Sequence, residues 1–171
     1  MFARPSDELR APPVAFLKAV LVVTGIAGTM DIIAAHLSRW AQTGKFPTMM
    51  FKGIAGGALG VQRAMQGGVG TMALGIFFHY FISFAFTLLF FLLFPRVPLL
   101  RKNRYAVGTA YALITWTIMT YIVLPASALP WSRPDLASQQ LYFGVAVFVV
   151  VFGLPIVFGA AWFYKRYPQA A

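Results

Sequence analysis

Residues 71–94 read TMALGIFFHYFISFAFTLLFFLLF and contain no Asp, Glu, Lys or Arg. The uncharged run around them extends from residue 64 to residue 95. A helix needs about 20 predominantly apolar residues to cross a hydrocarbon core about 30 Å thick. Phenylalanine and leucine dominate the stretch, which therefore predicts a transmembrane helix.

Three further stretches have the same character. Residues 105–132 and 136–164 carry no charged side chain, and residues 19–38 are interrupted only by Asp31. Because each can cross a bilayer, the sequence predicts an all-α fold, a polytopic transmembrane four-helix bundle that forms a single membrane domain over residues 1–171. The expected spans lie at about residues 16–37, 71–94, 105–124 and 141–162.

The composition excludes a water-soluble fold. Hydrophobic residues make up 60% of the chain and charged residues 11%, and the mean hydropathy is +0.75. A soluble protein with so few polar side chains could not cover its own surface. The chain has no cysteine, which excludes disulfides, thiolate metal sites, iron–sulfur clusters and cysteine nucleophiles.

The net charge of +10 gathers beside the predicted spans. No soluble basic domain is present to bind nucleic acid, so we expect these cations to contact the anionic headgroups of the lipid bilayer. The expected contacts are Arg96, Arg101, Lys102, Arg104, Lys165 and Arg166. Nine cations fall on the side of the two termini and five on the other side, which predicts that both termini are cytoplasmic.

The segment 38–70 is more polar than the spans. Its longest uncharged run, residues 53–62, is too short to cross a bilayer. Pro47 suits the first turn of a helix, and glycines at small-xxx-small spacing allow close packing. The sequence predicts an interfacial or re-entrant helix at about residues 47–66. A glycine-loosened surface loop is one alternative, and a fifth span that would split the termini is another.

The first apolar stretch has a competing interpretation. Lys18 precedes it, and Ile33-Ala34-Ala35 resembles a signal-peptide cleavage site. The leading tail, however, is long and carries Asp7 and Glu8, unlike the short basic start of a signal peptide. The sequence therefore favours an uncleaved span.

Two prolines are expected to interrupt the later helices. Pro125 is expected to end the third span, because proline cannot continue the hydrogen-bond ladder of a helix. Pro155 lies inside the fourth span, where it predicts a kink.

Asp31 is the only acid within a predicted span. A carboxylate at the centre of a membrane helix costs about 2.5–3.5 kcal/mol on insertion scales, and less toward the ends. An acid in this position is therefore a functional candidate. The alternative is a place near the interface, where Asp31 bonds water or a neighbouring helix.

His36 and His79 are the only histidines. Antiparallel first and second spans place His79 at about the depth of Asp31, which predicts an interaction between the two. Such a pair can relay protons, set a pH response or only satisfy two buried polar groups. A haem held by the two histidines and a pigment held by His79 are further alternatives.

The third span supplies the last candidates. Thr117, Thr120 and Tyr121 fall near one face of the helix, toward the end at which Asp31 and His79 are expected. They could line a small polar cavity. Threonine in a membrane helix also commonly bonds its own backbone or joins helices, which is the alternative.

Four short motifs carry a resemblance. They are Gly25-Ile-Ala-Gly-Thr-Met-Asp31, Lys45-Phe-Pro47, Gly56-Gly-Ala-Leu-Gly60 and His79-Tyr-Phe-Ile82. In these motifs the chain resembles small bacterial inner-membrane proteins of the YagU-like group. The resemblance implies four helices and a multi-pass location in the bacterial inner (plasma) membrane, and it brings no catalytic assignment with it.

Several classes of function remain. The leading interpretation is a small non-enzymatic membrane protein, an accessory or stress-related inner-membrane component with a homo-oligomer or another membrane protein as its partner. The alternatives are a small proton-coupled transporter or channel that uses Asp31 and His79, and a haem- or pigment-binding membrane subunit. An enzyme acting on a lipid or quinone would have only the same two residues as its nucleophile and base. No metal site is expected.

Overall fold

A computed structural model describes residues 12–168, and within them the ordered elements are all helical. Four helices are long and apolar enough to cross a membrane, so the chain is a multi-pass membrane protein. They are α1 (Pro13–Thr43), α4 (Val69–Leu93), a third over Arg104–Ala126 and a fourth over Gln139–Arg166. The predicted all-α fold with four spanning helices is confirmed.

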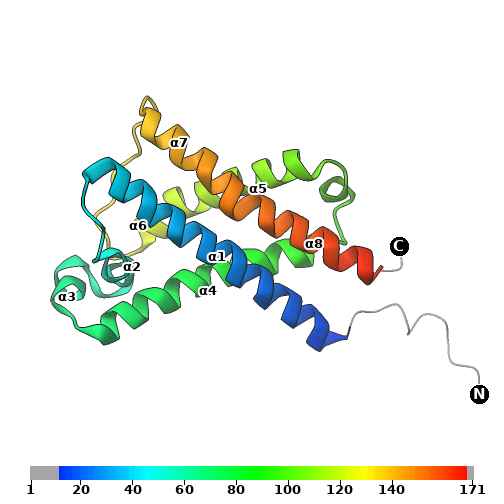
Figure 1. Cartoon of the computed structure of the whole chain (residues 1–171), viewed down its shortest axis with the longest axis horizontal. Helices are drawn as coiled ribbons and strands as arrows, with labels where there is room; N and C mark the ends of the chain where they lie inside the picture. The colour runs from blue at the N-terminus through cyan, green and yellow to red at the C-terminus, as the bar shows by residue number, and fades with distance from the viewer. Residues whose placement is uncertain (1–11, 169–171) are drawn as a thin grey trace, which may run out of the picture.

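The chain runs up and down, so its helices alternate in direction (Figure 1). One end of the bundle, here called the basic end, holds the start of α1, the turn after α4 with the 3₁₀ helix η1 (Pro98–Arg101), and the end of the fourth span. The opposite end, here called the loop end, holds the connections at residues 44–68 and 127–138.

The third and fourth spans each contain a π-helical turn. In the third, α5 (Arg104–Ile118) passes through η2 (Met119–Val123) into α6 (Leu124–Ala126). In the fourth, α7 (Gln139–Phe148) passes through η3 (Val149–Gly153) into α8 (Leu154–Arg166).

Both π turns directly precede a Leu-Pro pair. Proline lacks an N–H and its ring crowds the carbonyl one turn earlier, and a wider turn relieves both problems. The fourth span is therefore irregular just before Pro155, and the kink expected at this residue stays a prediction. The third span ends at Ala126, one residue beyond Pro125, where the sequence predicts its end.

The hydrophobic core lies toward the basic end. Large side chains there are completely buried, among them Phe90 and Phe91 of α4 and Phe163 of α8.

The third and fourth spans approach each other through glycine: a Cβ atom at position 153 would lie 2.4 Å from the carbonyl oxygen of Gly108. This contact requires the absence of a side chain at Gly153.

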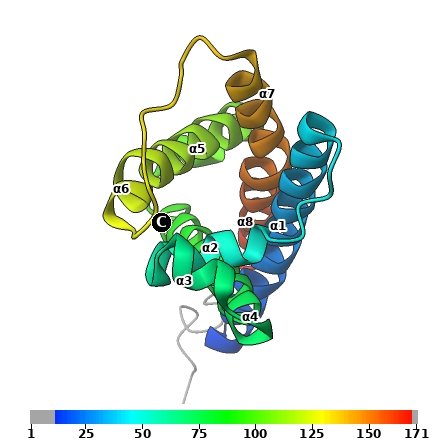
Figure 2. The same ribbon diagram turned by 90° about the vertical axis from the view of Figure 1, so that its left-hand side faces the viewer.

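The predicted helix between the first two spans is confirmed, but it is divided. Gly60 has a positive φ of 78°, and it separates α2 (Met50–Leu59) from α3 (Val61–Gln66). Both lie across the loop end beside the start of α4 (Figure 2). The backbones of α2 and α4 approach each other most closely at Gly75 of α4, where a Cβ atom would lie 1.9 Å from the carbonyl oxygen of Phe51. The glycines of α2 itself do not make this contact.

Candidate functional site

His79 joins the first two spans. Its Nε2 lies 2.8 Å from the carbonyl oxygen of Gly28, and its side chain is 9% exposed. A carbonyl can only accept, so Nε2 donates this hydrogen bond. Farther along α4, the hydroxyl of Ser83 donates to the carbonyl of His79 and that of Thr87 to the carbonyl of Ser83. The side chains of His79, Ser83 and Thr87 thus all donate hydrogen bonds to main-chain carbonyl groups.

Asp31 lies one turn beyond Gly28 on α1 and is partly buried. It is within electrostatic range of His79, yet no hydrogen bond or ion pair joins the two side chains. The direct partner of His79 is a backbone carbonyl, so the structure brings the two predicted residues near each other without pairing them.

Asp31 lines a crevice between three helices, here called the Asp31 crevice. Its volume is about 290 Å³. One wall is a face of α1 that carries Asp31 and Ser38, a second is Trp116 of α5, and a third is α7 with Gln140 and Gly144. Asp31 is the one charged side chain lining this crevice.

His36 lies elsewhere, at the loop end. Its Nδ1 is 2.8 Å from the carbonyl oxygen of Ile32, and its ring packs against Phe46 and Phe51 at centroid distances of 5.6 and 5.4 Å. Gly28, which binds His79, precedes His36 by eight residues, a rise of about 12 Å along the helix. The two histidine rings are thus held at different levels and do not face each other across a common site.

The three polar candidates of the third span lie in different local settings. Thr117 is exposed, and its hydroxyl donates a hydrogen bond to the carbonyl of Leu113, 2.8 Å away. It thus bonds the backbone of its own helix, which is one of the two roles considered for these threonines. Thr120 and Tyr121 lie within η2, where the π turn shifts the helical register. Tyr121 packs edge-on against Trp116 and Trp131, each at a centroid distance of 6.2 Å.

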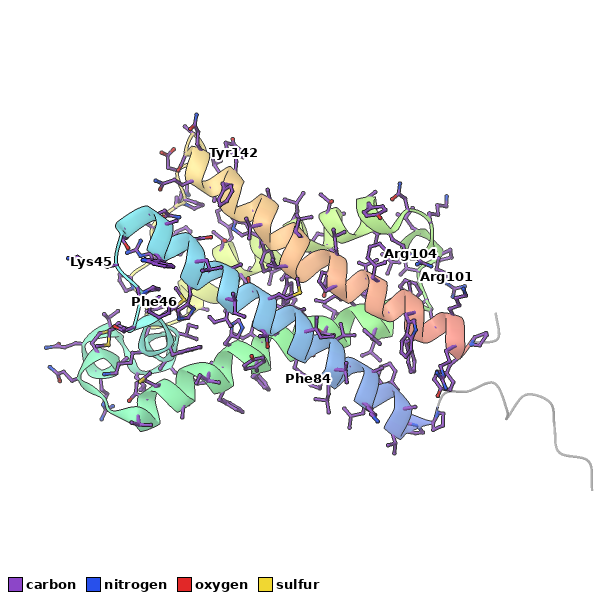
Figure 3. All side chains as sticks on the ribbon, viewed as in Figure 1. Lys45, Phe46, Phe84, Arg101, Arg104 and Tyr142 are labelled. Atoms are coloured by element: carbon purple, nitrogen blue, oxygen red, sulfur yellow. The ribbon has the colours of Figure 1, made fainter. Side chains whose placement is uncertain are left out.

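A second site, here called the basic pocket, lies at the basic end. Three cations line a cavity of about 240 Å³: Arg101 from η1, Arg104 from the start of α5, and Lys165 from α8. Its floor includes the rings of Phe94 and Tyr164, which stack at a centroid distance of 5.4 Å. Figure 3 shows Arg101 and Arg104 side by side at this end.

A third cavity, of about 690 Å³, lies at the loop end between α1, α2 and η2. Its lining is mainly apolar, with Met50, Ile54 and Met119 among its residues, and Arg39 and Lys45 are the charged side chains there. Figure 3 shows Lys45 and Phe46 at this end of the molecule, opposite the basic pocket.

Trp116 and Gln140 are residues that the sequence analysis did not select. Trp116 belongs to the expected third span, and Gln140 directly precedes the expected fourth span. Their meeting with Asp31 depends on which helices are neighbours, and hydropathy carries no such information. The signal available was depth: Gln140 lies in the first turn of the fourth span, at the loop end, and Asp31 lies in the half of the first span nearer that end.

Comparisons of this chain with protein-family models, with curated proteins and with solved structures give no match. What the chain is therefore follows from its own architecture. It is a small polytopic membrane protein with four apolar spanning helices and a short helical connection between the first two.

Proposed function

We propose that this protein is a non-enzymatic accessory component of a bacterial inner membrane, in the accessory or stress-related class, and that its basic end holds the headgroup of an anionic phospholipid. The observation that carries this proposal is the convergence of Arg101, Arg104 and Lys165 on one pocket. The resemblance to the YagU-like proteins supports the compartment.

The charges of the basic pocket have no acidic counterpart near them in the part of the chain that the structure describes. The acids among residues 12–168 are Asp31 and Asp135, and both lie in the half of the bundle nearer the loop end. Guanidinium groups bind phosphate with two parallel hydrogen bonds, which suits them to a lipid headgroup. The aromatic floor suits the level at which a membrane meets water.

Orientation agrees with this proposal. The positive-inside pattern assigns the basic end to the cytoplasm, where the leaflet surface is negatively charged. Both termini would then be cytoplasmic, and residues 127–138 would lie on the opposite side.

Structural roles for the polar groups of the spans support a non-enzymatic function. His79 binds the carbonyl of Gly28, and the hydroxyl of Tyr111 donates to that of Phe86 at 2.6 Å. The hydroxyl of Tyr164 donates to the carbonyl of Phe91 at 2.8 Å. Each bond joins two different spans, so these side chains stabilise the bundle.

Lipid-dependent thermal stability in a neutral detergent tests the lipid proposal. Phosphatidylglycerol should raise the melting temperature of the wild type more than phosphatidylcholine does. The double variant Arg101→Gln/Arg104→Gln should lose most of that difference, because each cation near an anionic surface contributes about 1 kcal/mol. Arg63→Gln/Arg133→Gln removes the same charge at the loop end and should keep the difference. An unchanged response in the first variant would contradict the proposal.

The accessory role needs a partner, and purification from native membranes tests for one. Gentle extraction should retain one membrane protein, or a second copy of this chain, in a fixed ratio. Isolation of the monomer alone under several mild detergents would argue against that role.

A second candidate is proton-coupled transport through Asp31 and His79. It is favoured by one observation: the Asp31 carboxylate is not hydrogen-bonded and lies near His79, and Asp31 lines a crevice. Proton flux into liposomes, followed with an internal pH dye, tests it. Flux that both Asp31→Asn and His79→Gln abolish would support this candidate, and absence of flux in the wild type would remove it.

A further inference from the structure

The carboxylate of Asp31 lacks a partner within the described chain. No hydrogen bond or ion pair to another side chain or to the backbone engages it, although it lies inside a transmembrane helix. An acid in such a place is energetically costly unless a proton, water or a cation accompanies it. The residues around Asp31 indicate which of these three partners suits the site.

The Asp31 crevice combines one negative charge with aromatic and amide groups. Trp116 forms the wall contributed by α5, and its edge-on contact with Tyr121 holds the indole in place. Gln140 adds an amide oxygen from the first turn of α7. A carboxylate with an indole nearby is the chemistry that recognises an ammonium group, because the face of tryptophan attracts cations most strongly among the aromatic rings.

We propose that the Asp31 crevice binds an organic ammonium cation, with Asp31 as its counter-ion and Trp116 as its aromatic wall. A metal ion fits the lining less well: among residues 12–168 no three His, Asp or Glu side chains gather, and the crevice offers a single carboxylate. The small residues Ala34, Ala35 and Gly144 leave room for the body of the ligand. This inference does not depend on the lipid proposal.

Gly144 provides a way to block the crevice without disturbing the bundle. A Cβ atom at this position would meet no atom within 4 Å, so a larger side chain can be accommodated there. Gly25 of α1 is equally unobstructed and does not line the crevice, which makes it a matched control.

Calorimetric titration of the purified full-length protein in a neutral detergent tests the proposal. The probes are benzyltrimethylammonium and its neutral isostere neopentylbenzene. We expect the cation to bind in preference to the isostere, and Asp31→Asn to weaken cation binding about tenfold or more. Asp135→Asn removes the acid of the outer loop and should leave binding unchanged. Trp116→Phe should weaken it by a smaller factor than Asp31→Asn.

Gly144→Leu supplies a second criterion that does not alter charge. It should abolish binding of the cation, while Gly25→Leu should not. If Asp31→Asn does not fold, as judged by circular dichroism and gel filtration, the glycine pair decides the question. Equal binding of the two probes to the wild type, or cation binding that survives Gly144→Leu, would overturn the proposal.

Discussion

The imidazole of His79 crosses from α4 to α1, where its Nε2 lies 2.8 Å from the carbonyl oxygen of Gly28. At the same place a Cβ atom on Gly28 would lie 3.2 Å from the ring of Tyr80 and 3.3 Å from the hydroxyl of Ser83. The hydrogen bond and the close packing therefore occupy one crossing point. The two residues together fix how the first two spans meet.

Replacing His79 by Phe should lower the free energy of unfolding by about 1 kcal/mol, because it removes a buried hydrogen bond between two membrane helices. Thermal unfolding in detergent measures the change. His79→Gln should lose less, since its amide can still donate from a similar position. Tyr80→Phe removes the exposed hydroxyl contact to Thr29 and is the control. An equal loss in all three variants would argue against the assigned role of the His79–Gly28 bond.

Replacing Gly75 by Ala should destabilise the contact between α2 and α4. The added Cβ would lie 1.9 Å from the carbonyl oxygen of Phe51, and backbone cannot move aside as a flexible side chain can. We expect a melting temperature clearly below that of Gly70→Ala, because position 70 of the same helix has open space around it. Similar melting temperatures for the two variants would show that α2 moves freely on α4.

Replacing Gly153 by Ala should separate the third and fourth spans. Its Cβ would meet the carbonyl of Gly108 at 2.4 Å and the methyl of Ala112 at 2.8 Å. Small-to-large changes in a packed interior commonly cost about 1–3 kcal/mol. Gly144→Ala, in the same span but in open space, should stay near the wild type. Thermal unfolding of the two variants makes the comparison.

The orientation can be read by labelling introduced cysteines, since the natural chain has none. Lys102→Cys lies in the turn at the basic end, and Ser132→Cys lies in the loop at the other end. With the basic end in the cytoplasm, an impermeant thiol reagent should label only Ser132→Cys in intact cells, and both variants after lysis. Labelling of Lys102→Cys in intact cells would reverse the orientation.

The spans could be predicted because crossing a membrane is a local property of the sequence. An uncharged apolar run of sufficient length predicts a span. A run that is too short predicts a helix that does not cross, as in the segment that forms α2 and α3. The π turns could not be foreseen in the same way. Proline disturbs a helix, but whether the helix also forms a π turn before it, as it does before Pro125 and Pro155, depends on the neighbouring helices.

The candidate site was only partly predictable for a related reason. Asp31 and His79 stand out because polar groups are rare in spans, and the structure does bring them near each other. The hydrogen-bond partner of His79 is a backbone carbonyl, which every residue possesses and no sequence pattern marks. Trp116 enters the site through a contact between spans that are separate in the sequence.

The two ends of the bundle should also differ in how readily their helices open. The completely buried phenylalanines lie toward the basic end, although cavities occur at both ends of the bundle. The η2 and α7 segments, by contrast, contain no buried residue. Local opening requires less free energy where fewer side chains interlock. The amide protons of η2 and α7 should therefore exchange with deuterium well before those at the ends of α4 and α8. Under the proposed cation binding, a ligand would therefore enter the part of the bundle that opens more readily, while the buried phenylalanines keep the basic end folded.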